Sequence, residues 1–191
     1  MAQVAIPDAA TGTGGNWTDT NTMGALYAAI DDGPSTGVHD PYTWVEVEDM
    51  GGDDTFIVSL SDLSKPGAGN VTFTIAASTD DNMGAGQGPR LRLDLCETTS
   101  FTVRATHIFT GIALNGSDSF THYDSDALDV SSVSDDKWDE LFVKITMLTN
   151  GGASDYMYLS QVFLTTPDAG AAAAVAADPD LPGAAFLMFI D

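Results

Sequence analysis

Val71-Thr72-Phe73-Thr74-Ile75-Ala76-Ala77 is the stretch that decides the fold. Its apolar side chains recur at every second residue, with threonine between them. A period of two is typical of a β-strand that buries one face, because successive strand residues point to opposite sides. The same pattern recurs in RLRLDL at 90–95 and in LFVKITM at 141–147. These stretches predict strands that share one buried core.

Further strand-like stretches follow the same pattern, and glycine-rich turns such as Asn115-Gly116 separate them. Many short strands with no intervening helical pattern favour an all-β fold over a parallel α/β sheet. We therefore expect a single antiparallel β-sandwich or jelly roll. The additional predicted strands are 43–48, 55–61, 101–109, 119–123, 127–131 and 156–164.

The two ends of the sequence differ from this pattern. Residues 1–32 hold a loop-like start and then an apolar segment, 23–30, which is either a short helix of about two turns or an irregular segment that closes the core. The sandwich domain is expected to span 1–167. The composition of residues 168–191 predicts an Ala/Gly/Pro linker that leads to an apolar C-terminal tail.

The charge is strongly one-sided, with 28 acidic and 6 basic residues and a formal net charge of −22. Binding to nucleic acid is not expected, because phosphate recognition needs clustered Lys and Arg. Aspartate makes up 24 of the acids, and aspartate suits turns more than helix interiors. Cys96 is the sole cysteine, so no intramolecular disulfide can form. The start lacks the pattern of a signal peptide and the apolar runs are too short to cross a bilayer, which predicts a protein made in a cytoplasm.

Catalysis is not expected. His39, His107 and His122 are the candidate general bases, and the last two lie inside strand-like stretches. No sequence motif of a nucleophile elbow, a zinc protease or a phosphate-binding loop is present. The sequence therefore favours a protein that is not an enzyme.

One acidic loop is the best candidate for a calcium site. Asp80, Asp81 and Asn82 could supply the oxygen ligands that calcium prefers, although they lack the spacing of an EF-hand. The alternative is that these side chains simply cap a turn. No other cofactor is expected.

Aromatic side chains could form a sugar-binding platform, or they could fill the core or a subunit contact. Those considered are Trp17, Tyr42, Trp44, Tyr123, Trp138, Tyr156 and Tyr158.

The apolar tail is a candidate docking element, because five consecutive bulky apolar residues are an aggregation hazard unless they are buried. It either folds back as an edge strand of its own sandwich or docks into a neighbouring subunit or host lattice. Its residues are Phe186, Leu187, Met188, Phe189 and Ile190.

Two stretches, DDKWDELFVKIT at 135–146 and YMYLSQVFLTTP at 156–167, resemble a recurring β-sandwich (jelly-roll-like) module of tailed-bacteriophage virion proteins. The resemblance covers about 17–167, with further matches at Trp17 and at 26–32, 53–60, 73–77 and 91–95. One departure is the stretch 33–48, which separates two segments that lie closer together in the module. The resemblance carries no catalytic residues.

This resemblance implies a non-enzymatic virion structural protein, with a capsid decoration, cement or head-spike role as the first hypothesis. Its expected partners are the major capsid protein or other virion subunits and further copies of itself, most simply in a trimer. A receptor- or glycan-binding module of a tail fibre or baseplate is the alternative, and a small polysaccharide hydrolase is a third. No membrane partner is expected.

Overall fold

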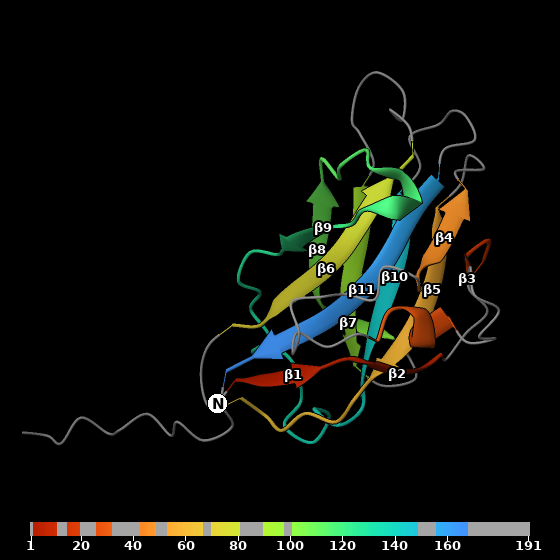
Figure 1. Ribbon diagram of the computed structural model, residues 1–191. Helices are drawn as coiled ribbons and strands as arrows, with labels where there is room; N and C mark the ends of the chain where they lie inside the picture. Colours follow the sequence, from red (N-terminus) through yellow and green to blue (C-terminus); the bar gives the residue numbers. More distant parts are fainter. Residues whose placement is uncertain are drawn as a thin grey trace, which may run out of the picture.

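Two antiparallel β-sheets pack face to face in the computed structural model (Figure 1). The structure describes residues 2–10, 15–19, 26–31, 43–48, 53–66, 70–80, 90–97, 101–148 and 156–167. This is the all-β sandwich that the alternating stretches predict, since each sheet turns its apolar face towards the other.

Sheet A has six strands, in the order β3-β4-β11-β6-β9, with β1 also paired to β11. β11 pairs with β4 through its first residues and with β1 through its last ones, so it forms the centre of the sheet. The strands are β1 (Gln3–Ala5), β3 (Thr18–Asp19), β4 (Val45–Glu48), β6 (Thr72–Thr79), β9 (Thr121–Asp124) and β11 (Tyr156–Thr166).

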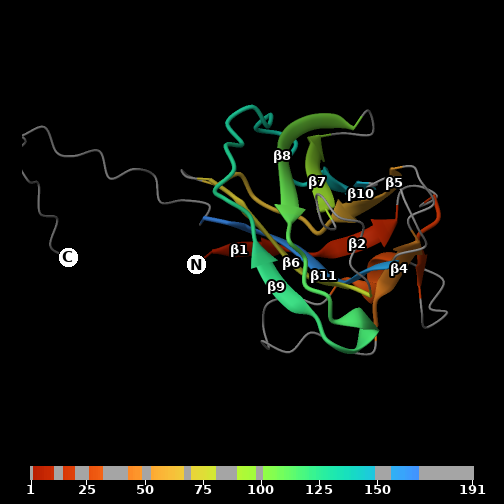
Figure 2. The same ribbon diagram turned by 90° about the horizontal axis from the view of Figure 1, so that it is seen from above.

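Sheet B has five strands, in the order β2-β5-β10-β7-β8. Seen from above, β8, β7, β10 and β5 form one layer, and β9, β6, β11 and β4 form the other (Figure 2). The strands are β2 (Pro7–Ala10), β5 (Asp54–Leu60), β7 (Arg90–Glu97), β8 (Thr102–Thr110) and β10 (Leu141–Leu148).

The core lies between the sheets and is built from the inward positions of the alternating stretches. β5, for example, alternates buried and half-buried residues along its whole length. Burial of such side chains contributes roughly 1.5–3 kcal/mol each. The largest fully buried side chains are Phe56, Phe73, Ile30, Ile75, Leu91, Leu93, Leu95, Leu141, Ile145, Met147 and Met157.

The first residues are strands where the sequence suggested a loop-like start. β1 pairs with β11 of sheet A and β2 pairs with β5 of sheet B, so the chain passes from one sheet to the other at Ile6. Ile6 N donates to Ser61 Oγ at 3.1 Å, and Ser61 N donates to Ile6 O at 2.8 Å. Both strands are too short to show a period, and their partners lie far along the chain.

Two shorter segments also differ from a plain strand. The apolar segment before β4 contains a 3-10 helix, η1 (Leu26–Ala29), and the adjacent Ile30 is fully buried. The predicted strand at 127–131 is wrong: this stretch makes only an isolated bridge between Leu128 and Val71. Leu128 and Val130 are buried, but the backbone that carries them is irregular. A second 3-10 helix, η3 (Gly116–Asp118), precedes β9.

Within the described residues, no helix is long and apolar enough to cross a membrane.

Candidate functional site

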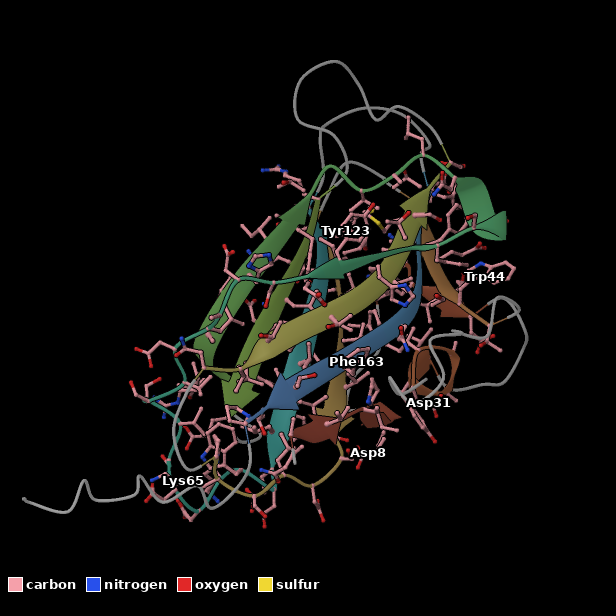
Figure 3. All side chains as sticks on the ribbon, turned by 60° about the vertical axis from the view of Figure 1, so that its left-hand side comes forward. Asp8, Asp31, Trp44, Lys65, Tyr123 and Phe163 are labelled. Atoms are coloured by element: carbon pink, nitrogen blue, oxygen red, sulfur yellow. The ribbon has the colours of Figure 1, made fainter. Side chains whose placement is uncertain are left out.

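Four aromatic side chains gather on the outer face of sheet A, the face turned away from sheet B. Trp44, Phe120, Tyr156 and Tyr158 pack together around Ala76, separately from the main core. The strand neighbours of the two tyrosines, such as Met157, are fully buried between the sheets, so alternation points the tyrosines outwards. We call these four residues the aromatic strip; Figure 3 labels Trp44 at the end nearest β4.

The two tyrosines are stacked and stand next to carboxylates. Their ring centroids are 6.2 Å apart and the ring planes differ by 15°. Tyr156 is paired with Glu48, and Tyr158 is paired with Glu46, on the adjacent strand β4. Directly paired residues on one face have neighbouring side chains. The register therefore places one carboxylate beside each ring.

Asp80 fixes the end of this arrangement from the other side. Tyr156 N donates to Asp80 Oδ1 at 2.7 Å, and Asp80 N donates to Tyr156 O at 3.4 Å. Tyr158 Oη donates to Asp80 Oδ2 over a long 3.4 Å contact. The strip is thus held by backbone and side-chain bonds as well as by packing.

The electrostatic surroundings keep both phenols protonated. Burial, followed by the charges of Asp80 and Glu46, raises the pKa of Tyr158 to about 12. The pKa of Tyr156 is also raised, chiefly by the negative charge of Glu48. Both hydroxyls therefore remain hydrogen-bond donors at neutral pH.

A polar row continues the outer face beyond the strip. His122 Nε2 lies 2.9 Å from Gln161 Oε1 and bridges two strands across Ala76, whose small side chain leaves room for the contact. A β-bulge between Leu159 and Gln161 makes this possible, because the extra residue resets the alternation and turns Gln161 outwards. Phe163 follows on the same face (Figure 3).

A shallow hollow of about 240 Å³ adjoins the strip. It is lined by Asn16, Thr18, Glu46, Glu48 and Tyr156. Oxygen acceptors, an amide and one aromatic ring thus meet around an open space. This set can accept hydrogen bonds from hydroxyl groups and can stack on an apolar ring face.

Both described histidines that the sequence singled out make structural contacts. His107 lies in β8, with its ring 4.5 Å from that of Phe109, and His122 contacts Gln161. Cys96 is fully buried, and burial raises its pKa to about 11, which keeps the thiol protonated and unreactive. His39 lies outside the described residues.

The predicted calcium ligands are described only in part. Both oxygens of Asp80 contact β11, while Asp81 and Asn82 lie outside the described residues. Among the residues that the structure describes, no three His, Cys, Asp or Glu side chains are grouped so as to hold a metal ion. Calcium binding by this loop stays a prediction.

The remaining aromatic candidates divide between the core and undescribed segments. Trp17 is buried and its Nε1 donates to Asp54 O at 3.2 Å, and Trp138 is buried as well. Tyr123 Oη accepts a bond from Ala113 N at 2.7 Å. The predicted docking residues Phe186 to Ile190, the linker before them and Tyr42 lie outside the described residues.

Sequence reasoning found three members of the strip and missed Phe120 and the flanking acids. Glu46 and Glu48 alternate with buried valines in the predicted strand 43–48, which already marked them as outward-facing. Their position beside the tyrosines depends on the pairing of β4 with β11. No local pattern in the sequence specifies that pairing.

No protein-family model matches the sequence, and no curated protein matches it. Among solved structures, the chain is similar to a xylan-binding module, CBM15, with 8% identity and a TM-score of 0.47 over 85% of this chain and 95% of that one. It is also similar to the CBM36-1 domain of a multidomain xylanase from the hindgut metagenome of Trinervitermes trinervoides. The identity is 13% and the TM-score is 0.41, over 89% of this chain and 99% of that one. A third similar structure is the enzymatically active domain of bacteriophage CBA120 tailspike protein 4. Its identity is 11% and its TM-score is 0.41, over 85% of this chain and 19% of that one. These likenesses concern the β-sandwich architecture.

Proposed function

We propose that this chain is a non-enzymatic binding module of a tailed-phage virion and that it holds carbohydrate on the aromatic strip. The observation that carries the ligand is the half-buried ring of Tyr156, which stacks on the buried ring of Tyr158 and has Glu46 and Glu48 near it on the outer face of sheet A. The virion assignment rests on the module that 135–146 and 156–167 resemble. This is the receptor- or glycan-binding alternative of the sequence analysis, now with a defined surface.

The chemistry of the strip suits a sugar. Aromatic faces carry partial negative charge, so they attract the C–H groups on the apolar side of a pyranose ring. Carboxylates accept only, and sugar hydroxyls are the donors that match them. A concave site with aromatic walls and a few placed polar groups is the usual form of a small-ligand site.

The charge of the strip restricts the sugar class. Glu46, Glu48 and Asp80 would repel uronates, sialic acids and sulfated units, because like charges brought together without compensation are unfavourable. We therefore expect neutral or amino sugars to bind in preference to acidic ones.

A glycan array that contains neutral, amino and acidic sugars, followed by calorimetry on the best ligand, tests this function. Replacing Tyr156 with alanine should weaken binding roughly two- to tenfold, because an aromatic contact contributes roughly 0.5–1.5 kcal/mol. The matched control is Thr165→Ala, a half-buried residue in β11 at the opposite end from Tyr156. Absence of saturable binding to every glycan, or an unchanged affinity for Tyr156→Ala, would refute the proposal.

A second candidate function is decoration or cementing of the capsid, or a head-spike role, with the major capsid protein and sister subunits as partners. A different surface favours it: Val103 and Ile108 on β8, an edge strand of sheet B, are 48% and 43% exposed. Exposed apolar side chains on a sheet edge suit contact with another protein.

Binding to particles separates the two candidates. Under the decoration hypothesis, a chain without residues 178–191 should no longer occupy particles while its thermal unfolding is unchanged. If the truncated chain still fully occupies the particles, Phe186 to Ile190 have no docking role. Particle binding that is competed by free sugar would instead favour the glycan function.

A further inference from the structure

The outer face of sheet B concentrates the positive charge of a very acidic protein. Four of the six basic residues lie on β7, β8 and β10, which are adjacent strands. Three of them, Arg90, Arg92 and Lys144, alternate with buried leucine and valine residues and so point away from the core. We call these three together with Val103 and Ile108 the cationic face.

Two of these charges lie outside the ion pairs of the described part of the chain, and one of the two, Lys144, is a cross-strand neighbour of Asp94. Arg92 Nε lies 3.2 Å from Asp94 Oδ2, and Arg104, the fourth basic residue of these strands, pairs with Glu97. Arg90 and Lys144 form no ion pair with any residue that the structure describes. Positive charge gathered on one face of a chain of net charge −22 is a feature that steers an acidic partner.

The same face is also apolar. Register places Ile108 beside Arg92, and Val103 beside Cys96, which is paired in turn with Phe142. Phe142 is half-buried and meets the ring of Phe101 edge-on at 5.5 Å. Apolar groups surrounded by charge resemble the core and rim of a protein contact surface.

A complementary surface lies at the end of the sandwich marked by Lys65 in Figure 3. Two adjoining hollows of about 280 Å³ and 560 Å³ share Lys65, Asp135 and Trp138. Their other acidic lining residues are Asp62, Asp129, Asp136 and Asp139. We call this pair of hollows the acidic hollow.

Its floor is apolar and contains an unsatisfied donor. Val130, Val133 and Trp138 are buried beneath the carboxylates. Trp138 is 4% exposed, and its indole N–H has no acceptor among the described residues. A buried donor without a partner costs about 1–3 kcal/mol. Lys65 pairs with Asp135 at 2.5 Å, and the remaining carboxylates leave the rim negative. The acidic hollow thus complements the cationic face, with an apolar centre and a rim of opposite net charge.

We propose that the acidic hollow of one copy of this chain docks on the cationic face of a second copy. Contact between two identical patches is disfavoured, because it would bring Arg90 and Lys144 against themselves, or Asp136 and Asp139 against themselves. A head-to-tail contact has no such conflict, and it closes into a ring such as a trimer if the rotation allows. This interface uses neither the aromatic strip nor carbohydrate, so it goes beyond the proposed function.

Two charge-reversal variants of the full-length chain test the contact in sedimentation velocity at low salt. The face variant is Arg90→Glu with Lys144→Glu, and the hollow variant is Asp136→Lys with Asp139→Lys. The unaltered chain should form a closed oligomer that dissociates as salt is raised. Each variant alone should be a monomer, and an equal mixture of the two should associate again, because the face variant keeps an intact hollow and the hollow variant keeps an intact face.

Matched controls keep the test decisive. Thr165→Glu adds acidic charge to the outer face of sheet A and should leave the oligomer intact. If a reversal variant fails to fold by circular dichroism, the milder pair Lys144→Gln and Asp136→Asn should weaken association without abolishing the fold. A monomeric unaltered chain, variants that still self-associate fully, or a mixture that stays monomeric would each overturn the proposal.

Discussion

Replacing Glu97 with glutamine should destabilise the sandwich far more than the same change at a surface glutamate. Glu97 is only 3% exposed at the end of β7. It accepts a bond from Arg104 Nε of β8, and its Oε1 accepts one from Ser134 N at 3.3 Å. It therefore joins the edge of sheet B to the irregular segment that precedes β10.

The expected loss in the free energy of unfolding at pH 7 is about 2 kcal/mol. A hydrogen bond to a charged group contributes roughly 1.5–3 kcal/mol, and glutamine keeps an acceptor for Ser134 N while it loses the charge. Breaking a fully buried pair costs about 3–5 kcal/mol. The side chain of Arg104 is 28% exposed, so water compensates part of that cost.

Urea denaturation at neutral and acidic pH measures this loss. Hydrogen bonding to Ser134, followed by the bond and charge of Arg104, lowers the pKa of Glu97 below its ordinary value of 4.5. A carboxylate with a lowered folded pKa stabilises the protein above its unfolded pKa, and the contribution disappears as pH falls through the folded value. The difference between the two proteins should therefore be full at pH 7 and should narrow well below pH 4.5.

Glu140→Gln is the matched control. Glu140 pairs with Lys137 at 3.0 Å, but its side chain is 54% exposed, and exposed pairs of this kind contribute at most about 1 kcal/mol. If Glu97→Gln lowers the free energy of unfolding by no more than Glu140→Gln does, the pair of Glu97 and Arg104 does not stabilise the sandwich. If the difference in the free energy of unfolding between the two proteins stays the same in acid, protonation of Glu97 does not control this part of the stability.

Three further outcomes are expected. Spectrophotometric titration of the native protein should show one tyrosine, Tyr158, that ionises only near pH 12, and Asp80→Asn should lower that value because it removes a neighbouring negative charge. Cys96 should not react with a thiol reagent at pH 8 in the folded protein and should react fully in denaturant, because burial raises its pKa to about 11; rapid reaction of the native protein would contradict its burial. Ala76→Leu should cost about 1–3 kcal/mol in thermal or urea unfolding by overpacking the fully buried site between His122 and Gln161, and an unchanged stability would argue against that bridge.

Strands with a long alternating pattern could be predicted from the sequence, and short or irregular ones could not. β6, β7 and β10 are eight residues long and their first four residues alternate in burial, so one buried face is visible without any knowledge of their partners. β1 and β2 form because β11 and β5 offer them an edge, which no local pattern reveals. The stretch 127–131 has the composition of a strand but makes a single bridge.

The candidate site was partly predictable for the same reason. Tyr156 and Tyr158 stand two residues apart in a predicted strand, so a shared face follows from the period. The acids beside them come from the register of β4 on β11, and Gln161 faces outwards only because of the bulge. Register and bulges depend on the whole sheet, so the composition of the site required the structure.

The central place of β11 in sheet A also determines when the protein can fold. Every other strand in the described residues leaves the ribosome before β11, yet β1, β4 and β6 all pair with it. In the nascent chain, the strand edges that pair with β11 therefore remain unpaired until Thr166 has been synthesised. Pairing across so large a sequence separation is slow and exposes the chain to aggregation. The many acidic side chains would help to keep such unfinished chains apart while they wait.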